Sequence, residues 1–204
     1  MASVVTICNI ALSRIGDSAS VSSIDPPDGS AQSEACYRLY PVALASCLDT
    51  HNWSFATKRA ELSELAEGQV AKNPWCHAFA LPADCRRVID ILNPECPRIK
   101  THKHDFEVIG AEFGSVILTN VKNPIVRYVM SDPKPSQFTG LFTDALAWLL
   151  ASYLAGETIR GDSAFSYLQN CQKMYQQTIA LAAKKDANLT HVKTRVIAPW
   201  ILRR

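Results

Sequence analysis

The sequence predicts an α+β protein: a four-helix bundle formed by N- and C-terminal helices, an inserted small antiparallel β domain, and an extended C-terminal arm. Three observations predict this class. Apolar residues repeat at helical spacing near both ends of the chain, short runs rich in Val and Ile fill the middle, and the last residues follow neither period. These patterns place the bundle in residues 1–52 and 138–186, the β domain in residues 53–137 and the arm in residues 187–204.

Composition predicts a soluble globular chain with a sizeable core. The 204 residues are 48% hydrophobic and 20% charged, and no stretch approaches the roughly 18 consecutive apolar residues of a membrane helix. The first 15 residues lack the basic start and small-residue cleavage pattern of a secretory signal, so we expect synthesis in the cytoplasm and no membrane partner. Seven cysteines, an odd number set mostly in apolar patterns, predict reduced and buried thiols.

The first helix has both a start signal and a stop signal. Ser3 is placed to cap it, and Gly16 is placed to end it after Ile15. Its apolar face consists of Val5, Cys8, Leu12 and Ile15. Residues 17–30 are polar and contain two prolines and a glycine, which predicts a connecting loop.

Residues 30–62 connect the two predicted layers. Their first half predicts a core-facing helix with the apolar stripe Cys36, Leu39, Tyr40, Ala43, Leu44, Cys47 and Leu48. Pro41 lies inside it and costs about 3 kcal/mol in a straight helix, so we expect a kink near Tyr40. From Trp53 to Leu62 an aromatic-led, nearly alternating pattern predicts a strand. The predicted domain junction is therefore Tyr40, Pro41, Trp53 and Phe55.

Five further runs predict strands at Ala78–Pro82, Arg86–Leu92, Phe106–Gly110, Ser115–Thr119 and Pro124–Met130. Gly110 and Gly114 bracket one turn, and residues 120–124 mark another. Neighbouring strands should therefore pair antiparallel. After a proline-containing breaker at residues 132–135, helical spacing returns, first up to Gly161 and then from a capping Asp162 through Ala182.

Several residue sets have the types of side chain found in catalytic or metal-binding sites, but their spacing favours none of them. A zinc site would draw on Cys76, His77, Cys85, Cys96, His102 and His104, but the cysteines are too widely spaced for paired ligands. Ser13, Asp17 and His51 lack the Gly-x-Ser-x-Gly context of a hydrolase nucleophile. Glycine-rich phosphate-binding loops are missing too. We expect no catalytic residue, no metal and no cofactor.

The C-terminal arm is the predicted contact surface. From Lys184 onward the chain has six Lys or Arg and one acidic residue, while the residues before it carry a net negative charge. Trp200 lies among aliphatic residues, and aromatic and Arg side chains are common interface anchors. The residues predicted to contact a protein partner are Lys193, Arg195, Val196, Ile197, Trp200, Ile201, Leu202, Arg203 and Arg204. A free solvated tail and a phosphate-binding arm are the alternatives.

With these elements in order, the sequence resembles the tail tubular protein A family, the head-to-tail adaptors of short-tailed bacteriophages. The residues that carry the resemblance are Ala11, Leu12, Ile15 and Gly16, then Tyr40, Leu44, Trp53–Ala56 and Arg59, then Leu81, Pro82 and Asp84. They cover the first half of the chain. None of them has a side chain whose chemistry is specific to the family.

The resemblance implies a virion protein at the head–tail junction. Such a protein forms a dodecameric ring below the portal, contacts the tail nozzle and possible tail fibres or spikes, and lets genomic DNA pass. It also implies that residues 196–204 face the portal or a neighbouring subunit. Two other functions stay open at this point: a small tail-associated hydrolase, and a DNA-binding module that uses the basic arm.

Overall fold

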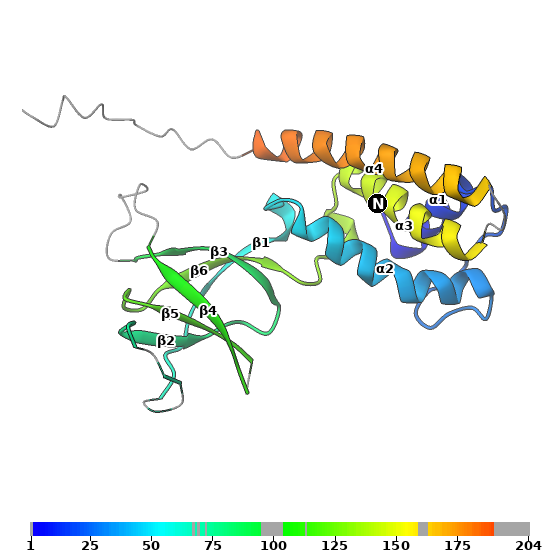
Figure 1. Ribbon diagram of the computed structural model, residues 1–204. Helices are drawn as coiled ribbons and strands as arrows, with labels where there is room; N and C mark the ends of the chain where they lie inside the picture. Colours follow the sequence, from blue (N-terminus) through cyan, green and yellow to red (C-terminus); the bar gives the residue numbers. More distant parts are fainter. Residues whose placement is uncertain are drawn as a thin grey trace, which may run out of the picture. The chain divides into compact units, whose positions relative to one another are not determined.

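The computed structural model describes residues 2–66, 68, 70–71, 73–94, 104–112, 114–158 and 163–189. These residues fall into two compact units, a helical unit of Met1–Ala56 with Ser131–Leu189 and a β unit of Thr57–Met130 (Figure 1). The predicted mixed class is confirmed, since the described residues form four helices and two small antiparallel sheets. No helix among them is both long enough and apolar enough to cross a membrane.

The helical unit is organised around one buried helix. Its helices are α1 (Val4–Arg14), α2 (Ala31–Asp49), α3 (Gly140–Thr158) and α4 (Ser163–Ala187). The other three helices all pack against α3. This follows from its sequence, because α3 carries apolar residues on every side and such a helix is stable only when buried. Its fully buried residues include Phe142, Ala145, Leu146, Ala147, Leu150, Ala151, Leu154 and Ala155.

The local signals at the start of the chain are confirmed. The Ser3 hydroxyl accepts a hydrogen bond from the Thr6 amide at 3.1 Å, and Gly16 has a positive φ of 80° where the helix ends. In α2 the Ser30 side chain caps the helix in the same way. That helix continues through Pro41 as one element.

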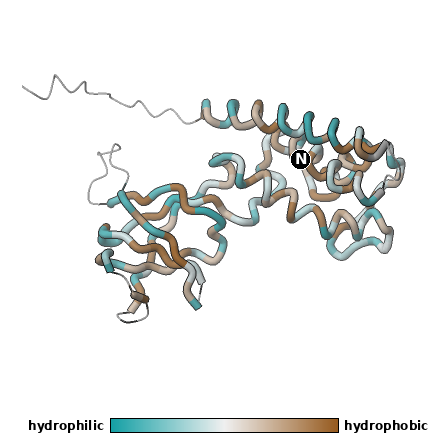
Figure 2. The backbone as a smooth tube through the Cα atoms, viewed as in Figure 1, coloured by the Kyte–Doolittle hydropathy of each residue, from teal (hydrophilic) through white to brown (hydrophobic). Residues whose placement is uncertain are grey.

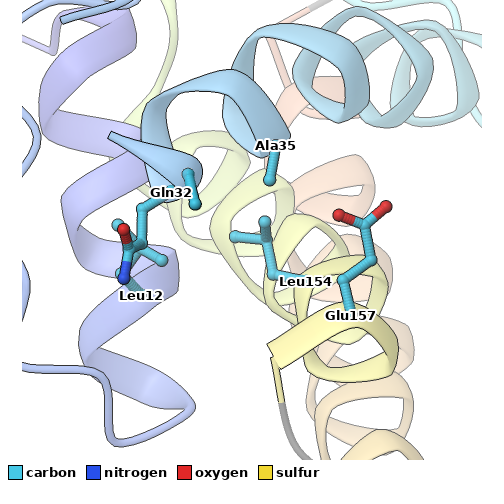
Figure 3. A pocket seen from close by; sticks show the side chains of 6 residues that line it. Leu12, Gln32, Ala35, Leu154 and Glu157 are labelled. Carbon is cyan, nitrogen blue, oxygen red and sulfur yellow. The ribbon is translucent and has the colours of Figure 1, made fainter. Parts of the chain in front are cut away.

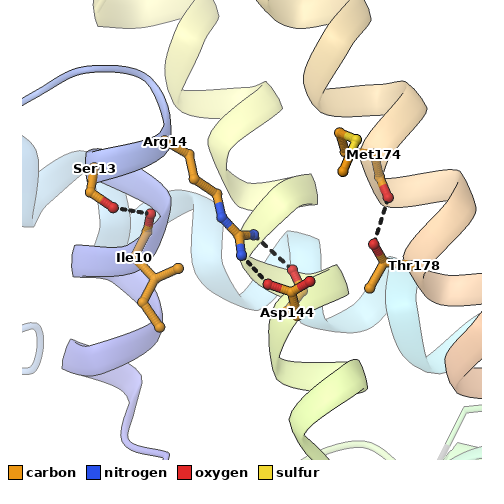
Figure 4. A network of polar contacts seen from close by, with 6 residues as sticks. All are labelled: Ile10, Ser13, Arg14, Asp144, Met174 and Thr178. Atoms are coloured by element: carbon orange, nitrogen blue, oxygen red, sulfur yellow. Dashed lines mark hydrogen bonds and ion pairs between the residues drawn. The ribbon is translucent and has the colours of Figure 1, made fainter.

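In contrast to α3, α4 buries only a narrow seam, and its remaining surface mixes polar side chains with exposed apolar ones, among them Phe165, Tyr167 and Leu181. Hydrophilic and hydrophobic stretches alternate along it (Figure 2). The seam consists of Cys171, Thr178, Ala182 and Asp186. Thr178 satisfies its hydroxyl within the helix by donating to the Met174 carbonyl at 2.8 Å (Figure 4).

Arg14 fastens α1 to α3. Its guanidinium donates to the Asp144 carbonyl oxygen at 2.9 Å and pairs with the Asp144 carboxylate (Figure 4). The same group lies 4.0 Å from the ring centroid of Trp148. A planar, forked cation can make these contacts together, whereas an ammonium cannot.

We therefore expect Arg14→Lys to lower the free energy of unfolding by about 1–2 kcal/mol, because one donor geometry and the ring contact are lost together. Arg38→Lys is the matched control. Arg38 forms a single ion pair with Glu157 at 3.0 Å and its side chain is 62% exposed, so its loss should cost less than about 0.5 kcal/mol. Urea unfolding followed by circular dichroism measures both. Equal effects from the two variants would contradict this account of Arg14.

The β unit contains two three-stranded antiparallel sheets. Its strands are β1 (Thr57–Glu61), β2 (His77–Ala80), β3 (Cys85–Leu92), β4 (Phe106–Ala111), β5 (Gly114–Thr119) and β6 (Ile125–Met130). The strand orders are β1-β6-β3 and β2-β5-β4. Phe79, Ile91, Ile117 and Val121 pack in one core cluster, so side chains of both sheets meet in a shared core. A second cluster around Val116 is covered by Leu65 and Trp75.

Two predictions about the strands are wrong. The strand expected from Trp53 begins at Thr57, because Ser54–Ala56 forms a 3-10 helix and Trp53 turns into the helical core. The strands on either side of residues 120–124 were expected to pair, but β5 pairs with β2 and β4 while β6 pairs with β1 and β3. The turn predicted at residues 120–124 is present, but it leads from β5 in one sheet to β6 in the other.

Candidate functional site

A cluster of aromatic rings lies where α2 ends within the helical unit. Trp53 is fully buried, and its ring centroid lies 4.9 Å from that of Phe142 and 5.9 Å from that of Phe55. Phe138 completes the cluster, 4.9 Å from Phe142. The indole Nε1 donates to the Cys47 carbonyl oxygen at 2.9 Å, so the buried N–H has a partner. The same oxygen also accepts from the amide and the hydroxyl of Thr50 at the end of α2.

A buried carboxylate adjoins this cluster. Asp186, in the last turn of α4, is 4% exposed. Its Oδ2 accepts from the Ser54 backbone amide at 3.0 Å, and its Oδ1 accepts from the Ser54 hydroxyl at 2.6 Å. The Nε2 atom of His51 lies 3.4 Å from Oδ2. One side chain of α4 thus satisfies the polar groups of the turn that follows α2.

Ser54, His51 and Asp186 are the residue types of a hydrolytic triad and lie close together, but their arrangement does not fit a triad. In a triad the imidazole lies between the hydroxyl and the carboxylate, so that it can take the hydroxyl proton. Here the carboxylate is the shared partner, and the Ser54 hydroxyl donates directly to Asp186. The arrangement holds two helix ends together and does not generate a nucleophile.

The same contacts fix the end of α4. Asp186 ties the last turn of α4 to the turn after α2, and the Leu189 amide donates back to the Asp186 carbonyl at 2.9 Å. Leu189 is the last described residue. The last turn of α4 is therefore held in the helical unit by hydrogen bonds to a buried carboxylate.

The buried thiols of the helical unit are part of its core. Cys8, Cys36, Cys47 and Cys171 are buried, whereas Cys76 is exposed and Cys85 is half-buried. Burial raises the pKa of the Cys47 thiol to about 12, and its sulfur lies 4.0 Å from the Tyr175 hydroxyl. At neutral pH Cys47 is a protonated thiol and so a poor nucleophile.

The β unit has a polar cluster around Asp84, a residue of the resemblance. The Lys58 ammonium and the Tyr128 hydroxyl each donate to its carboxylate at 2.8 Å. The contacts from Lys58 and Tyr128 hold the pKa of Asp84 below its usual value. On the same sheet Arg127 forms a bidentate pair with Asp90, with distances of 2.8 and 2.6 Å.

This geometry predicts a pH-dependent contribution of Asp84 to stability. Because the folded-state pKa lies below the unfolded-state value of about 3.9, the contribution is present above that pH and is lost as pH falls through the folded pKa. At pH 7 we expect Asp84→Asn to cost less than about 1 kcal/mol, since both partners are substantially exposed.

The difference between the wild-type chain and the Asp84→Asn variant should shrink toward zero between about pH 5 and pH 2. Urea unfolding at a series of pH values measures it. A difference that stays constant across this range would show that the ion pair and hydrogen bond contribute nothing through ionisation.

The predicted site residues fall into two groups. All the predicted contact residues of the C-terminal arm lie outside the described residues. They are Lys193, Arg195, Val196, Ile197, Trp200, Ile201, Leu202, Arg203 and Arg204. Of the predicted junction residues, Trp53 and Phe55 join the aromatic cluster, Tyr40 is buried and Pro41 is exposed on α2. The Tyr40 hydroxyl has no hydrogen-bond partner among the described residues.

The residue sets considered for catalysis or metal binding have separate structural roles. Ser13 donates to the Ile10 carbonyl at 2.8 Å (Figure 4). Asp17 accepts from Gln32, and His51 lies beside Asp186. Of the residues that a zinc site would draw on, His77 contacts Glu64 at 2.7 Å, whereas Cys96 and His102 lie outside the described residues. Within the described part of the chain, no three His, Cys, Asp or Glu residues converge as metal ligands would.

Sequence reasoning missed Ser54 and Asp186. In the sequence, Asp186 is the one acidic residue of a basic segment. A spacing signal was present, because Thr178, Ala182 and Asp186 are four residues apart on the buried seam. An acidic residue that continues an apolar seam indicates a buried carboxylate with a specific partner.

No family model matches the chain, and no curated protein matches its sequence.

Proposed function

We propose that this protein is a structural virion component, a head-to-tail adaptor that forms a ring between the portal and the tail nozzle of a short-tailed bacteriophage. In this proposal the four helices act as one bundle, and the strands between them form a domain inserted into it. The ring surrounds the path of the genomic DNA and offers surface to tail fibres or spikes.

One observation carries the proposal. The motif Trp53–Ala56, which is central to the family resemblance, is also the place where the helical unit buries its aromatic cluster and holds the end of α4. Other residues of the resemblance, including Ala11, Leu12 and Leu44, are buried in the same unit. The shared residues thus stabilise the helical unit and involve no catalytic group, which suits an adaptor whose function is assembly.

The proposal is tested by sedimentation of the full chain mixed with the portal protein of the same phage. We expect the chain to co-migrate with portal rings, and we expect a variant that ends at Leu189 to lose this association. A chain that stays at the top of the gradient in the presence of portal would contradict the adaptor function.

The same preparation separates the adaptor from the DNA-binding alternative. A DNA-binding module predicts affinity for duplex DNA that falls steeply with salt and disappears with the arm. An adaptor whose lumen lets DNA slide should bind duplex DNA weakly. Tight DNA binding without portal association would favour the alternative.

A further inference from the structure

The helical unit contains a small cavity where α1, α2 and α3 meet. Its lining comes from Leu12, the first turns of α2 and the last turns of α3, and its volume is about 220 Å³. Leu154 points toward Ala35 across the opening, and the carboxylate of Glu157 lies at its edge (Figure 3). Sites for small molecules usually measure about 300–1,000 Å³, so this cavity suits one large side chain better.

The segment that leads into the cavity-lining turn of α2 is acidic. Between Arg14 and Arg38 the sequence has four acidic residues and no Lys or Arg: Asp17, Asp25, Asp28 and Glu34. Gln32, in the lining, donates to the Asp17 carboxylate at 3.2 Å. Hydrogen bonds from Ser30 and Ser22 hold the pKa of Asp28 well below its usual range, so this carboxylate is charged at neutral pH.

The end of α3 adds to this preference for a cation. Glu157 lies in the last turn of α3, where the terminal carbonyl groups also favour positive charge. Its side chain is 41% exposed and pairs with Arg38. An apolar floor with a carboxylate at the edge fits an apolar side chain that is followed by a basic one.

We propose that this cavity receives Trp200 from the C-terminal arm of a second copy of the chain, with the adjacent arginines Arg203 and Arg204 against the acidic edge. The arm combines an aromatic anchor, aliphatic neighbours and four basic residues without an acidic one between Lys193 and Arg204. This contact deepens the proposed function, on which it rests, because it would join neighbouring subunits of the ring.

The length of the C-terminal arm favours a Trp200 from a second copy over the Trp200 of the same copy. Only four residues separate the end of α3 from the start of α4, so α4 begins near the cavity and runs away from it. With 25 residues, α4 is about 37 Å long. Trp200 is 11 residues beyond Leu189, a distance that spans at most about 36–40 Å when fully extended. A return within one copy would need an almost straight arm, whereas a neighbouring copy removes that constraint.

The test places a photo-reactive benzoylphenylalanine at position 200 of the full chain, without portal and at high protein concentration. Copies labelled with ¹⁵N are mixed with unlabelled copies, so that mass spectrometry distinguishes links between copies from links within one. We expect links between copies, to residues 31–35 or 154–157. Links within one copy, links to another surface, or no links would each overturn the proposal.

Ala31→Trp supplies the blocking variant, because Ala31 is exposed and its new side chain would fill the cavity. It should lower the yield of these links at least tenfold. Ala180→Trp, at an exposed position of α4, is the matched control and should leave the yield unchanged. Unfolding curves confirm that both variants fold. An unchanged yield in Ala31→Trp would overturn the proposal.

Sedimentation with portal, performed on the same samples, separates this inference from the adaptor function. Links to the cavity without portal association would retain the contact and refute the adaptor. Portal association without links to the cavity would retain the adaptor and refute the contact.

Discussion

Replacing Trp53 with alanine is expected to lower the free energy of unfolding of the helical unit by about 3–5 kcal/mol. The side chain is fully buried against Phe55 and Phe142, so its removal leaves a cavity in the aromatic cluster. The Cys47 carbonyl oxygen also loses its indole donor. Urea unfolding followed by far-ultraviolet circular dichroism measures the change.

The Trp53→Phe variant separates the contribution of ring packing from that of the hydrogen bond to Cys47. Phenylalanine keeps much of the ring packing but has no donor for Cys47, so the expected loss is smaller than that of Trp53→Ala. Equal losses in the two variants would show that the hydrogen bond dominates. If the Trp53→Ala chain kept wild-type stability and assembled normally with portal, the cluster would have no organising role.

The second large effect is expected at Asp186. Replacement by alanine removes the buried carboxylate that accepts from both the Ser54 amide and the Ser54 hydroxyl, and a hydrogen bond to a charged group contributes about 1.5–3 kcal/mol. We expect a total loss of about 2–4 kcal/mol. The loss should concentrate at the ends of α2 and α4, where faster amide hydrogen exchange would report local opening.

Asp186→Asn is the control for the Asp186→Ala variant. The asparagine side chain keeps the size and one oxygen acceptor but lacks the second acceptor, so it should lose less stability than alanine. A matched substitution on the exposed face, Lys185→Ala, should change stability by less than about 0.5 kcal/mol. If Asp186→Ala were no more harmful than Lys185→Ala, the carboxylate would not hold the two helix ends.

The features predicted correctly from sequence depend on local chemistry. Ser3 and Gly16 define α1 because a cap and a left-handed glycine act on residues within one turn. The hairpin between β4 and β5 follows from Gly114, which has a φ of 127°. Such signals need no knowledge of the rest of the chain.

The features that sequence reasoning missed depend on distant contacts. The aromatic pattern after Trp53 predicts a strand, but burial against Phe142, 89 positions further along the chain, draws the indole into the helical core. Likewise, Asp186 meets Ser54 across 132 residues, so its neighbours in sequence show only a basic helix end. In the β unit, the turn before β6 could not specify which sheet β6 would join.

The most direct test of the adaptor proposal is electron microscopy of the full chain mixed with the portal protein of the same phage. The proposal predicts a closed ring of copies of this chain bound coaxially to the portal ring, with the central channel open for DNA. Portal rings that stay bare at saturating concentrations of the folded chain would contradict it.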